Sequence, residues 1–342
     1  MKIGITYDLK ADVPTGANLP DDFQEEFDSP VTIESITKAL RDLGHEVEAL
    51  GDGRELLERL LRDPPDFVFN IAEGHGVGRC REARVPAVLE MLGIPYTGSD
   101  PLTLSVTLDK DCAKRLVQSA GVAVPRGIVV EPDHDLTDLP RLPYTAIVKP
   151  AWEGSSKGIR GKCVVDGAEE LTEAVSALRR DHRQPILVEE YISGEELTVG
   201  IVGNERPRII GILRVVPLRA DERFVYSLEV KRDYLQQVRY ECVPAKQLDA
   251  VAEAALKVYR VLGCRDVSRI DFRLHNGTPY FLEVNPLPGL NPESSDLVIL
   301  SRLAGWSYEQ LIESILQAAT ARCPPSSADS GQRIADSGSL QP

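Results

Sequence analysis

The chain has 342 residues, of which 42% are hydrophobic and 27% are charged, so we expect two or three folded domains with sizeable cores. Its formal net charge is −14, which argues against nucleic acid or an anionic membrane as the main partner. The six cysteines are scattered without a Cys-x-x-Cys pair, which argues against disulfides or zinc. The apolar run at the N-terminus is too short for a signal peptide, so we expect a cytoplasmic protein.

The first 98 residues alternate predicted strands with predicted helices. We expect strands at 2–7, 45–50 and 66–72, and helices at 31–43, 54–63 and 81–93, the last of them followed by IPYTG (94–98). This alternation indicates βαβ units on a mostly parallel sheet. Residues 8–30, rich in Asp, Pro and Gly, are predicted to form a long loop over that sheet, and such loops are often functional.

The second part of the chain has a different pattern, in which short strands and hairpins dominate. We expect strands at 144–150, 162–166, 186–192, 197–203 and 208–216, and helices at 109–119, 169–180 and 245–262. This part is typical of an α+β fold. We place domain boundaries at 1–98, 99–186 and 187–321, followed by a Pro/Ser/Gly/Asp-rich tail at 322–342 that we expect to be disordered.

The segment RIDFRLHNGTPYFLEVNP (269–286) alternates charged and apolar residues on both sides of a predicted turn. A two-residue turn would pair Asp271 with Leu282, whereas a loop of three or five residues would pair Asp271 with Glu283. Directly opposed like charges destabilise a hairpin unless a positive group lies between them. Two carboxylates and the amide of Asn285 on one strand face would suit Mg²⁺. A solvated amphipathic face is the simpler interpretation.

A glycine-rich segment and two lysines suggest phosphate binding. The segment EGSSKGIRG (153–161) offers backbone N–H groups, two hydroxyls and two cations, but its spacing matches neither a P-loop nor a dinucleotide fingerprint. A flexible connector is the alternative. Lys149 ends an apolar strand, where it either meets an anion or extends its charge to solvent. Lys110 begins a helix, where a cation opposes the helix dipole. Either a bound anion or exposure to solvent would explain its presence there.

Two further segments are candidates for ligand contacts. LVEEYISGEELTV (187–199) is a predicted strand followed by four acids, which could hold an adenine and a ribose or form an acidic surface hairpin. His75 follows a predicted strand at the carboxyl edge of the first sheet, where open α/β sheets bind ligands. A solvent-exposed loop histidine is the alternative.

In order and spacing, these motifs resemble the ATP-grasp superfamily, and most closely the D-alanine–D-alanine ligase family. The resemblance rests on Lys110, VKPAWEGSSKG, VEEYISGEELTV, RIDF, LEVNPLPG, IPYTGSD with its following DK, and NPLPGLNPESS. It covers roughly residues 1–320. It implies an α/β plus α+β fold, namely an ATP-grasp fold with an N-terminal parallel-sheet domain for substrate. The phosphate-covering loop would lie in 99–186 and the magnesium site in 187–321.

The resemblance also implies a set of site residues. ATP would be bound by Lys110, Lys149, Ser155, Ser156, Glu189, Glu190, Tyr191, Ile192, Glu196 and Lys231. Mg²⁺, with Mn²⁺ as an alternative, would be held by Asp271, Glu283 and Asn285. The amino acids would contact His75, Glu82, Arg269, Gly289 and Ser294, and the catalytic set would be Arg269, Ser155, His75 and Gly289.

The activity that this resemblance implies is ATP-dependent joining of two amino acids through an acyl phosphate, with D-alanine as the default substrate. The expected partners are small amino acids and, by the family, a second copy of the chain in a homodimer. One alternative is a dipeptide or depsipeptide ligase with other substrates. Another is a nucleotide-binding protein without catalysis, against which the retained Arg269, Asp271, Glu283 and Asn285 argue.

Departures from the family pattern concentrate where the amino acids would bind. The family's Gly-Gly-x-Ser-x-Glu segment is absent, which leaves Asp28 or Glu34 as candidates for the acid that holds the first ammonium. The family's Gly-Glu-Asp-Gly becomes GRCREARVP, which leaves Glu82 as the remaining acid. Ser294-Ser295 replaces Ser-Leu. Arg232 replaces a tyrosine, and we expect it to pair with a protein carboxylate because a free buried arginine is costly. The alternative is that Arg232 points into the pocket unpaired, which would favour a first substrate with an extra carboxylate.

Overall fold

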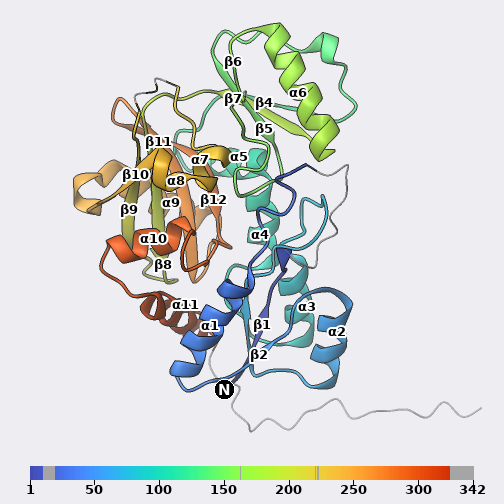
Figure 1. The fold of residues 1–342 in the computed structure, drawn as a ribbon, viewed down its shortest axis with the longest axis vertical. Helices are drawn as coiled ribbons and strands as arrows, with labels where there is room; N and C mark the ends of the chain where they lie inside the picture. Colours follow the sequence, from blue (N-terminus) through green and yellow to red (C-terminus); the bar gives the residue numbers. More distant parts are fainter. Residues whose placement is uncertain (11–19, 162, 220, 222, 324–342) are drawn as a thin grey trace, which may run out of the picture.

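The computed structural model describes residues 1–10, 20–161, 163–219, 221 and 223–323. The predicted tail and the middle of the predicted 8–30 loop therefore lie largely outside the described residues. The described part contains three sheets: one of three strands, one of four and one of five (Figure 1). None of its helices combines the length and apolar character that crossing a membrane requires.

The N-terminal unit is a parallel sheet with helices on both faces, as the alternating pattern predicts. Its strands have the order β2-β1-β3. The elements are β1 (Lys2–Thr6), α1 (Pro30–Asp42), β2 (Glu46–Ala49), α2 (Gly53–Arg62), β3 (Phe67–Asn70) and α3 (Arg84–Leu92). Leu56, Leu60 and Leu89 of α2 and α3 pack together with Val68 on one face. The segment 94–98 after α3 adds a single bridge to this sheet, between Tyr96 and Val68.

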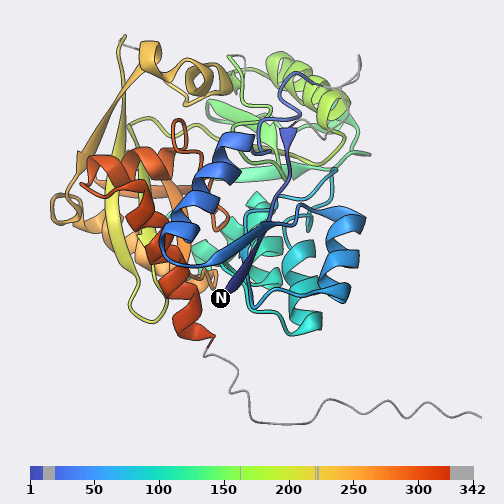
Figure 2. The same ribbon diagram turned by 60° about the horizontal axis from the view of Figure 1, so that its bottom comes forward.

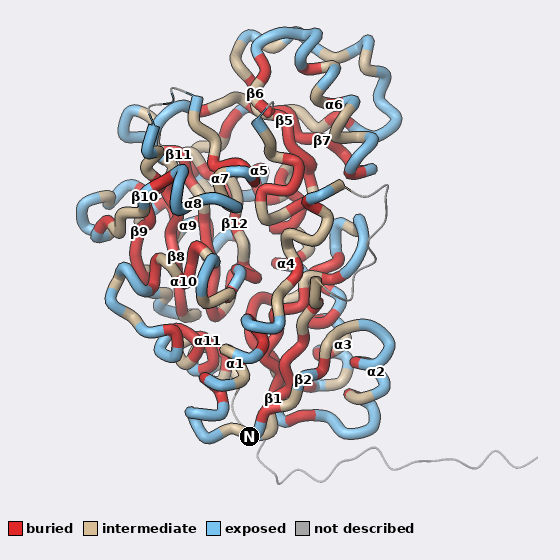
Figure 3. The backbone as a smooth tube through the Cα atoms, viewed as in Figure 1, coloured by how far each residue is buried: buried red, intermediate tan, exposed pale blue. Residues whose placement is uncertain are grey.

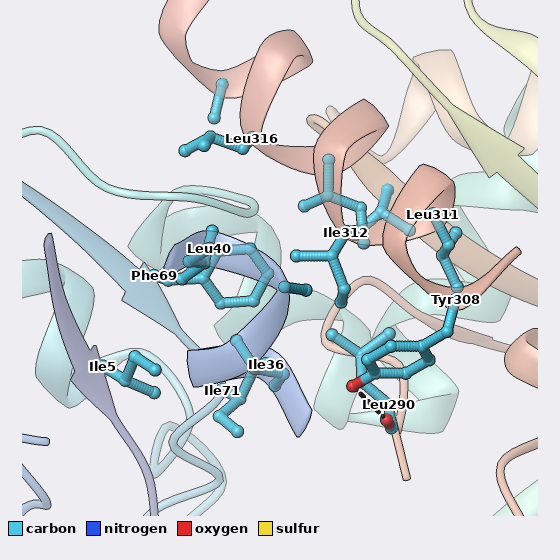
Figure 4. Packing of buried hydrophobic residues seen from close by; sticks show 14 of the residues in the cluster. Ile5, Ile36, Leu40, Phe69, Ile71, Leu290, Tyr308, Leu311, Ile312 and Leu316 are labelled. Atoms are coloured by element: carbon cyan, nitrogen blue, oxygen red, sulfur yellow. Dashed lines mark hydrogen bonds between the residues drawn. The ribbon is translucent and has the colours of Figure 1, made fainter. Parts of the chain in front are cut away.

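The other face of this sheet is covered by helices from both ends of the chain. Ile36 and Leu40 of α1 pack in one cluster with Leu311 and Ile312 of α11 (Tyr308–Arg322) (Figures 2 and 4). The Tyr308 hydroxyl donates to the Leu290 carbonyl oxygen at 3.0 Å. The last helix therefore contributes to the core of the first domain.

The middle unit is an antiparallel sheet of order β4-β7-β5-β6, reached through two consecutive helices. Its elements are α4 (Pro101–Leu108), α5 (Lys110–Ser119), β4 (Gly127–Val130), β5 (Ala146–Pro150), β6 (Val164–Val165), α6 (Ala168–His182) and β7 (Ile186–Glu190), with a short 3₁₀ turn at Leu136–Asp138. Helix α4 has no polar face that would reveal its period, which explains why the sequence pattern did not predict it. Asp100 caps it by accepting from the Thr103 amide at 2.8 Å.

The C-terminal unit is an antiparallel sheet of order β10-β9-β8-β11-β12. Its elements are β8 (Glu195–Val202), β9 (Arg208–Pro217), α7 (Leu228–Arg232), α8 (Tyr234–Gln237), β10 (Val238–Val243), a 3₁₀ turn (Ala245–Gln247), α9 (Asp249–Val261), β11 (Val267–His275), β12 (Thr278–Asn285) and α10 (Asp296–Leu303). Most residues of its central strands β8, β9 and β11 are buried (Figure 3). By contrast, α2 of the N-terminal unit and α6 of the middle unit each expose one face to solvent.

The β11–β12 hairpin settles the register that the sequence left open. Asn276 and Gly277 have φ values of 48° and 80° and form a two-residue turn, so Phe272 pairs with Phe281. A bulge at Leu282 then shifts the register, and Asp271 lies opposite Glu283. The short turn and the opposed acids, which the sequence analysis treated as alternatives, therefore occur together.

Candidate active site

Two pockets meet at the polar face of this hairpin. We call the first the intersheet pocket, because β5 and β7 of the four-stranded sheet and β8, β11 and β12 of the five-stranded sheet line it. We call the second the N-terminal pocket, because residues 25–32 and the loop after β3 form one side of it. Asp271 and Glu283 face the intersheet pocket, whereas Arg269 and Asn285 face the N-terminal pocket. The hairpin therefore runs from one pocket into the other.

Lys149 points into the intersheet pocket and does not extend its charge to solvent. It is 4% exposed, and its Nζ lies 2.6 Å from Glu189 Oε1. Lys114, which the sequence analysis did not single out, binds the other oxygen of Glu189 at 3.0 Å. Burial lowers the pKa of Lys114 to about 8, with the Lys149 charge acting in the same direction. One carboxylate thus fixes two lysines at the base of the pocket.

The predicted adenine and ribose segment borders the same pocket. Glu190, Tyr191, Ile192 and Glu196 all line it. The Glu196 carboxylate is bound by Arg273 at 2.8 Å, and this guanidinium also lies 5.7 Å from the Tyr191 ring centre. Lys231, on α7, lines the pocket with its Nζ 5.2 Å from the centre of the Tyr226 ring. The structure therefore brings this segment and Lys231 together with Lys149.

The hairpin face carries alternating charges at close range. Arg269 lies 3.1 Å from Asp271 and 3.7 Å from Glu283, and Lys110 lies 2.9 Å from Glu283. Burial would raise the pKa of Glu283, but Lys110, Lys149 and other cations hold it well below its usual value. Burial and the neighbouring Glu283 raise the pKa of Asp271. The positive group required between the two opposed acids is the Arg269 guanidinium.

The chemistry of this face fits a divalent cation. Asp271 and Glu283 offer carboxylate oxygens from adjacent strands, and Asn285 follows on the same strand as Glu283. The buried Nδ2 atom of Asn285 has no hydrogen-bond partner among the described residues, so no protein contact fixes that end of the amide, and its Oδ1 atom would be the ligand of a cation. Hard oxygen ligands of this kind suit Mg²⁺.

The glycine-rich segment lies between the two pockets. Ser155 lines the N-terminal pocket and Ser156 lines the intersheet pocket. Both serines have positive φ, 51° and 58°, a conformation that is strained for a residue with a side chain. The Ser156 hydroxyl donates to the Tyr226 carbonyl oxygen at 3.1 Å. The segment therefore closes over the place where the pockets meet.

Acidic residues of the loop after β1 hold this segment closed. The Gly158 amide donates to Asp22 at 2.9 Å, and Lys157 lies 3.0 Å from Glu26. Arg232, on α7, pairs with Asp21 at 3.1 Å and Glu25 at 2.7 Å. Arg232 thus meets protein carboxylates, as expected.

The turn after β12 forms another wall of the N-terminal pocket. Gly289 and Ser294 both line it. A Cβ atom at Gly289 would lie 2.9 Å from the Ser295 hydroxyl oxygen, so a side chain there would displace the turn. Asn291 joins this turn to α1 by donating to Ser29 and Thr32, each at 3.2 Å.

The loop after β3 brings Glu73 to the N-terminal pocket, and His75 is not among the residues that line it. The His75 Nε2 lies 2.8 Å from Asp8, and its ring packs 5.2 Å from the ring of Phe27, which does line the pocket. His75 therefore contacts a residue of the pocket wall, and its direct contact with the first amino acid stays a prediction. The signal that could have identified Glu73 is its place three residues after β3, at the carboxyl edge of the parallel sheet.

Glu82 and Asp28 also line the N-terminal pocket, whereas Glu34 does not. Glu34 lies on an exposed position of α1, so of the two candidates for the first ammonium only Asp28 reaches the pocket. Burial raises the pKa of Asp28 to about 7, partly opposed by a hydrogen bond from Thr32. Sequence reasoning also missed Arg81, which is 1% exposed and lies beneath the pocket.

The fold and this site together define an ATP-grasp ligase. A family model described as "D-ala D-ala ligase C-terminus" matches residues 116–317, more than half of the chain. The D-alanine–D-alanine ligase of Aquifex aeolicus is 35% identical over 290 residues, which cover 83% of this chain and 93% of that protein. The chain therefore belongs to the D-alanine–D-alanine ligase family.

Other proteins are similar to this chain over most of their length. The D-alanine–D-alanine ligase of Gluconobacter oxydans is 32% identical, with 86% of this chain and 95% of that protein covered. An uncharacterized protein of Sinorhizobium fredii is 36% identical, with 84% of this chain and 87% of that protein covered. A crystal structure of the Bacillus anthracis D-alanine–D-alanine ligase complexed with ATP shares the fold, with a TM-score of 0.69, 23% identity, and 94% of this chain and 98% of that chain covered.

Proposed function

We propose that this protein joins two amino acids in an ATP-dependent reaction that passes through an acyl phosphate, with D-alanine as the default substrate. The observation that carries the proposal is the hairpin face that runs from the intersheet pocket into the N-terminal pocket. A nucleotide in the first pocket and a carboxylate in the second would meet beside Arg269 and Lys110. Family membership supports this arrangement.

In this proposal ATP occupies the intersheet pocket. Lys149, Lys231 and Ser156 bind phosphate oxygens, the segment from Glu189 to Ile192 faces the adenine, and Glu196 faces the ribose. Asp271, Glu283 and Asn285 hold Mg²⁺, or Mn²⁺ in its place, and the metal supplies charge neutralisation on the phosphates.

The chain's own residues then account for both chemical steps. Phosphoryl transfer to a carboxylate needs positive charge around the transferred group, which Lys110, Lys149 and Arg269 supply. The amine of the second amino acid then attacks the acyl phosphate, so that the amide bond forms, the amine loses a proton and inorganic phosphate leaves. Arg269 and a backbone amide near Gly289 stabilise the oxyanion of the tetrahedral intermediate. Closure of the glycine-rich segment excludes water, which would otherwise hydrolyse the acyl phosphate.

A phosphate-release assay with D- and L-amino acids, singly and in pairs, tests the proposal. We expect ATP- and Mg²⁺-dependent release with at least one pair. Lys149→Ala should reduce turnover by about 100-fold or more, because one phosphate-binding cation is lost. Lys38→Ala, which removes an exposed lysine of α1, is the matched control and should retain wild-type kinetics. Equal rates in the two variants would contradict the proposed role of Lys149.

The homodimer and the cytoplasmic location remain predictions. Sedimentation of the purified chain measures the first of them directly.

A further inference from the structure

The N-terminal pocket has an excess of acidic side chains. Six carboxyl groups line it against three cationic side chains. The carboxyl groups belong to Glu25, Glu26, Asp28, Glu73, Glu82 and Glu153. A neutral zwitterionic amino acid brings one ammonium and one carboxylate, so its binding leaves this excess unchanged. Recognition therefore depends on which of the six already have a cationic partner in the protein.

Three of the six are neutralised by ion pairs. Glu26 and Glu153 both contact the Arg81 guanidinium, at 2.7 and 3.2 Å, and both contact Lys157, at 3.0 and 2.6 Å. These four charges form a compensated buried cluster. Glu25 is bound by the guanidinium of Arg232, on α7, at 2.7 Å.

Glu73 and Glu82 are not neutralised in this way. In the part of the chain that the structure describes, neither side chain has a hydrogen bond or an ion pair. Glu82 is only 8% exposed, yet it lines the pocket. The pocket's strongest cations are already engaged, Lys110 with Glu283 and Arg269 with Asp271. A buried carboxylate without a partner is destabilising, so such a residue suggests a ligand that completes it.

The protonation of the two carboxyl groups agrees with this geometry. Burial raises the pKa of Glu82 to about 7, with Arg81 opposing and Glu26 adding to the effect. Burial and the neighbouring Glu82 raise the pKa of Glu73 well above its usual value. The charged groups that act on the pair are Arg81, Glu26, Asp28, Lys110 and Glu153. Binding of a cation would displace the protons that these carboxyl groups retain.

A metal ion is a poorer match for this pair than an organic cation. Among the described residues, the only group of three His, Cys, Asp or Glu side chains whose ligand atoms lie within 4.8 Å of one another is Asp8, Asp52 and His75. Within the described part of the chain, Glu73 and Glu82 therefore have no third His, Cys, Asp or Glu ligand atom close enough to complete a metal site. An ammonium with three N–H donors can bridge acids that stand further apart.

We propose that one of the two amino acids used by this protein carries a second amino group, and that Glu73 and Glu82 bind this second ammonium. The inference rests on the proposed function, because it assigns the substrate class of the same pocket. Asp28 remains available for the α-ammonium, and the α-carboxylate lies toward Arg269 and Lys110. The predicted class is a diamino acid, and a neutral amino acid such as alanine would leave Glu73 and Glu82 unsatisfied.

Calorimetric binding to the full chain tests the inference without requiring turnover. Both enantiomers of 2,4-diaminobutyrate, ornithine and lysine are compared with the neutral analogues 2-aminobutyrate, norvaline and norleucine, with and without a non-hydrolysable ATP analogue and Mg²⁺. We expect at least one diamino acid to bind about tenfold or more tightly than its neutral analogue, the size expected for a charge-assisted hydrogen bond. Equal or weaker binding of every diamino acid would overturn the inference.

Variants locate the effect. Glu73→Gln and Glu82→Gln keep the shape of each side chain and remove its charge, so each should reduce the preference for the diamino acid by about tenfold. Glu34→Gln removes an exposed acid of α1 and should leave the preference unchanged. A preference that persists in the double variant Glu73→Gln/Glu82→Gln would overturn the assignment to these residues.

Turnover separates this inference from the proposed function. Phosphate release that is faster with neutral than with diamino acids would overturn the inference and retain the ligase. Selective diamino acid binding without phosphate release for any pair would support the inference and contradict the proposed function. The affinity for the diamino acid should also rise with pH through about 7, because its ammonium replaces protons on Glu82 and Glu73.

Discussion

At the scale of single residues, the charged side chains of this site fall into two groups. Lys149 and Arg269 are buried with carboxylates in direct contact, so their charges are fixed in place before any ligand binds. Glu82 is buried without such a contact. The first group makes a preorganised electrostatic environment, which stabilises developing charge without reorganisation. The second group reduces the stability of the protein, and this can be measured.

Replacing Glu82 by Gln should stabilise the protein at pH 8 and have little effect at pH 5. The folded-state pKa of Glu82 is raised to about 7, so folding keeps a proton that the unfolded chain has already released. Stability therefore falls as the pH rises from the unfolded pKa through about 7. We expect Glu82→Gln to raise the free energy of unfolding by about 1–3 kcal/mol at pH 8 relative to wild type.

Urea unfolding of wild type and Glu82→Gln at both pH values measures this difference. The exposed-site variant Glu34→Gln is the control and should show no such pH dependence. A destabilised Glu82→Gln protein at pH 8 would mean that Glu82 has a cationic partner in solution.

At the scale of elements, a bulge in the hairpin sets the register of the candidate metal site. Strict alternation places Phe281 and Glu283 on the same face of β12. The bulge at Leu282 separates them, so Phe281 packs in the core and Glu283 faces the pocket. Val284, three residues after Phe281, returns to the core. The bulge thus places the Glu283 side chain on the pocket face of the hairpin instead of the core face.

Deleting Leu282 should therefore remove the bulge and keep the opposed acids. Phe281 would stay opposite Phe272, and Glu283, then the next residue of the strand, would lie opposite Asp271 in a regular ladder. We expect Mg²⁺-ATP binding to persist in the deletion variant. Leu282→Ala keeps the number of residues, and so should keep both the bulge and the binding. Nucleotide titrations of the two variants measure this, and loss of binding in the deletion variant alone would contradict the register.

At the scale of the whole molecule, the two ends of the described chain pack together and position the N-terminal pocket. Helix α11 covers the face of the parallel sheet that α1 also covers (Figure 4). Asn291, in the turn that precedes α10, hydrogen-bonds to the start of α1. The wall of the pocket made by residues 25–32 is therefore held against the hairpin by packing far from the chemistry.

Ile312→Ala should test this coupling. Ile312 is fully buried between α11 and α1, so the substitution should lower the free energy of unfolding by about 2–5 kcal/mol. We also expect amino-acid binding to weaken more than nucleotide binding, because only the N-terminal pocket uses the packed domain as a wall. Glu313→Ala, a change on a more exposed position of the same helix, is the control. Equal loss of both binding activities would contradict a specific link between this packing and the N-terminal pocket.

Patterns in the sequence were enough to predict the fold class, the family, and several of the residues that line the intersheet pocket. These follow from local patterns, because alternation in strands, helical spacing and short motifs each act within a few residues of the chain. Lys149, Glu196, Lys231, Asp271 and Glu283 lie together in the structure as those motifs predicted.

Only the tertiary structure decided the hairpin register and the composition of the N-terminal pocket. The register depends on a bulge that satisfies core packing and the turn at the same time, and both alternatives looked equal from the alternation alone. Asp28, Glu73, Glu82 and Gly289 come to this pocket from separate parts of the chain. Whether each of the three carboxyl groups has a cationic partner depends on the tertiary structure. His75 and Glu73 are two residues apart in the sequence, and the course of the loop after β3 alone determines which of them reaches the pocket.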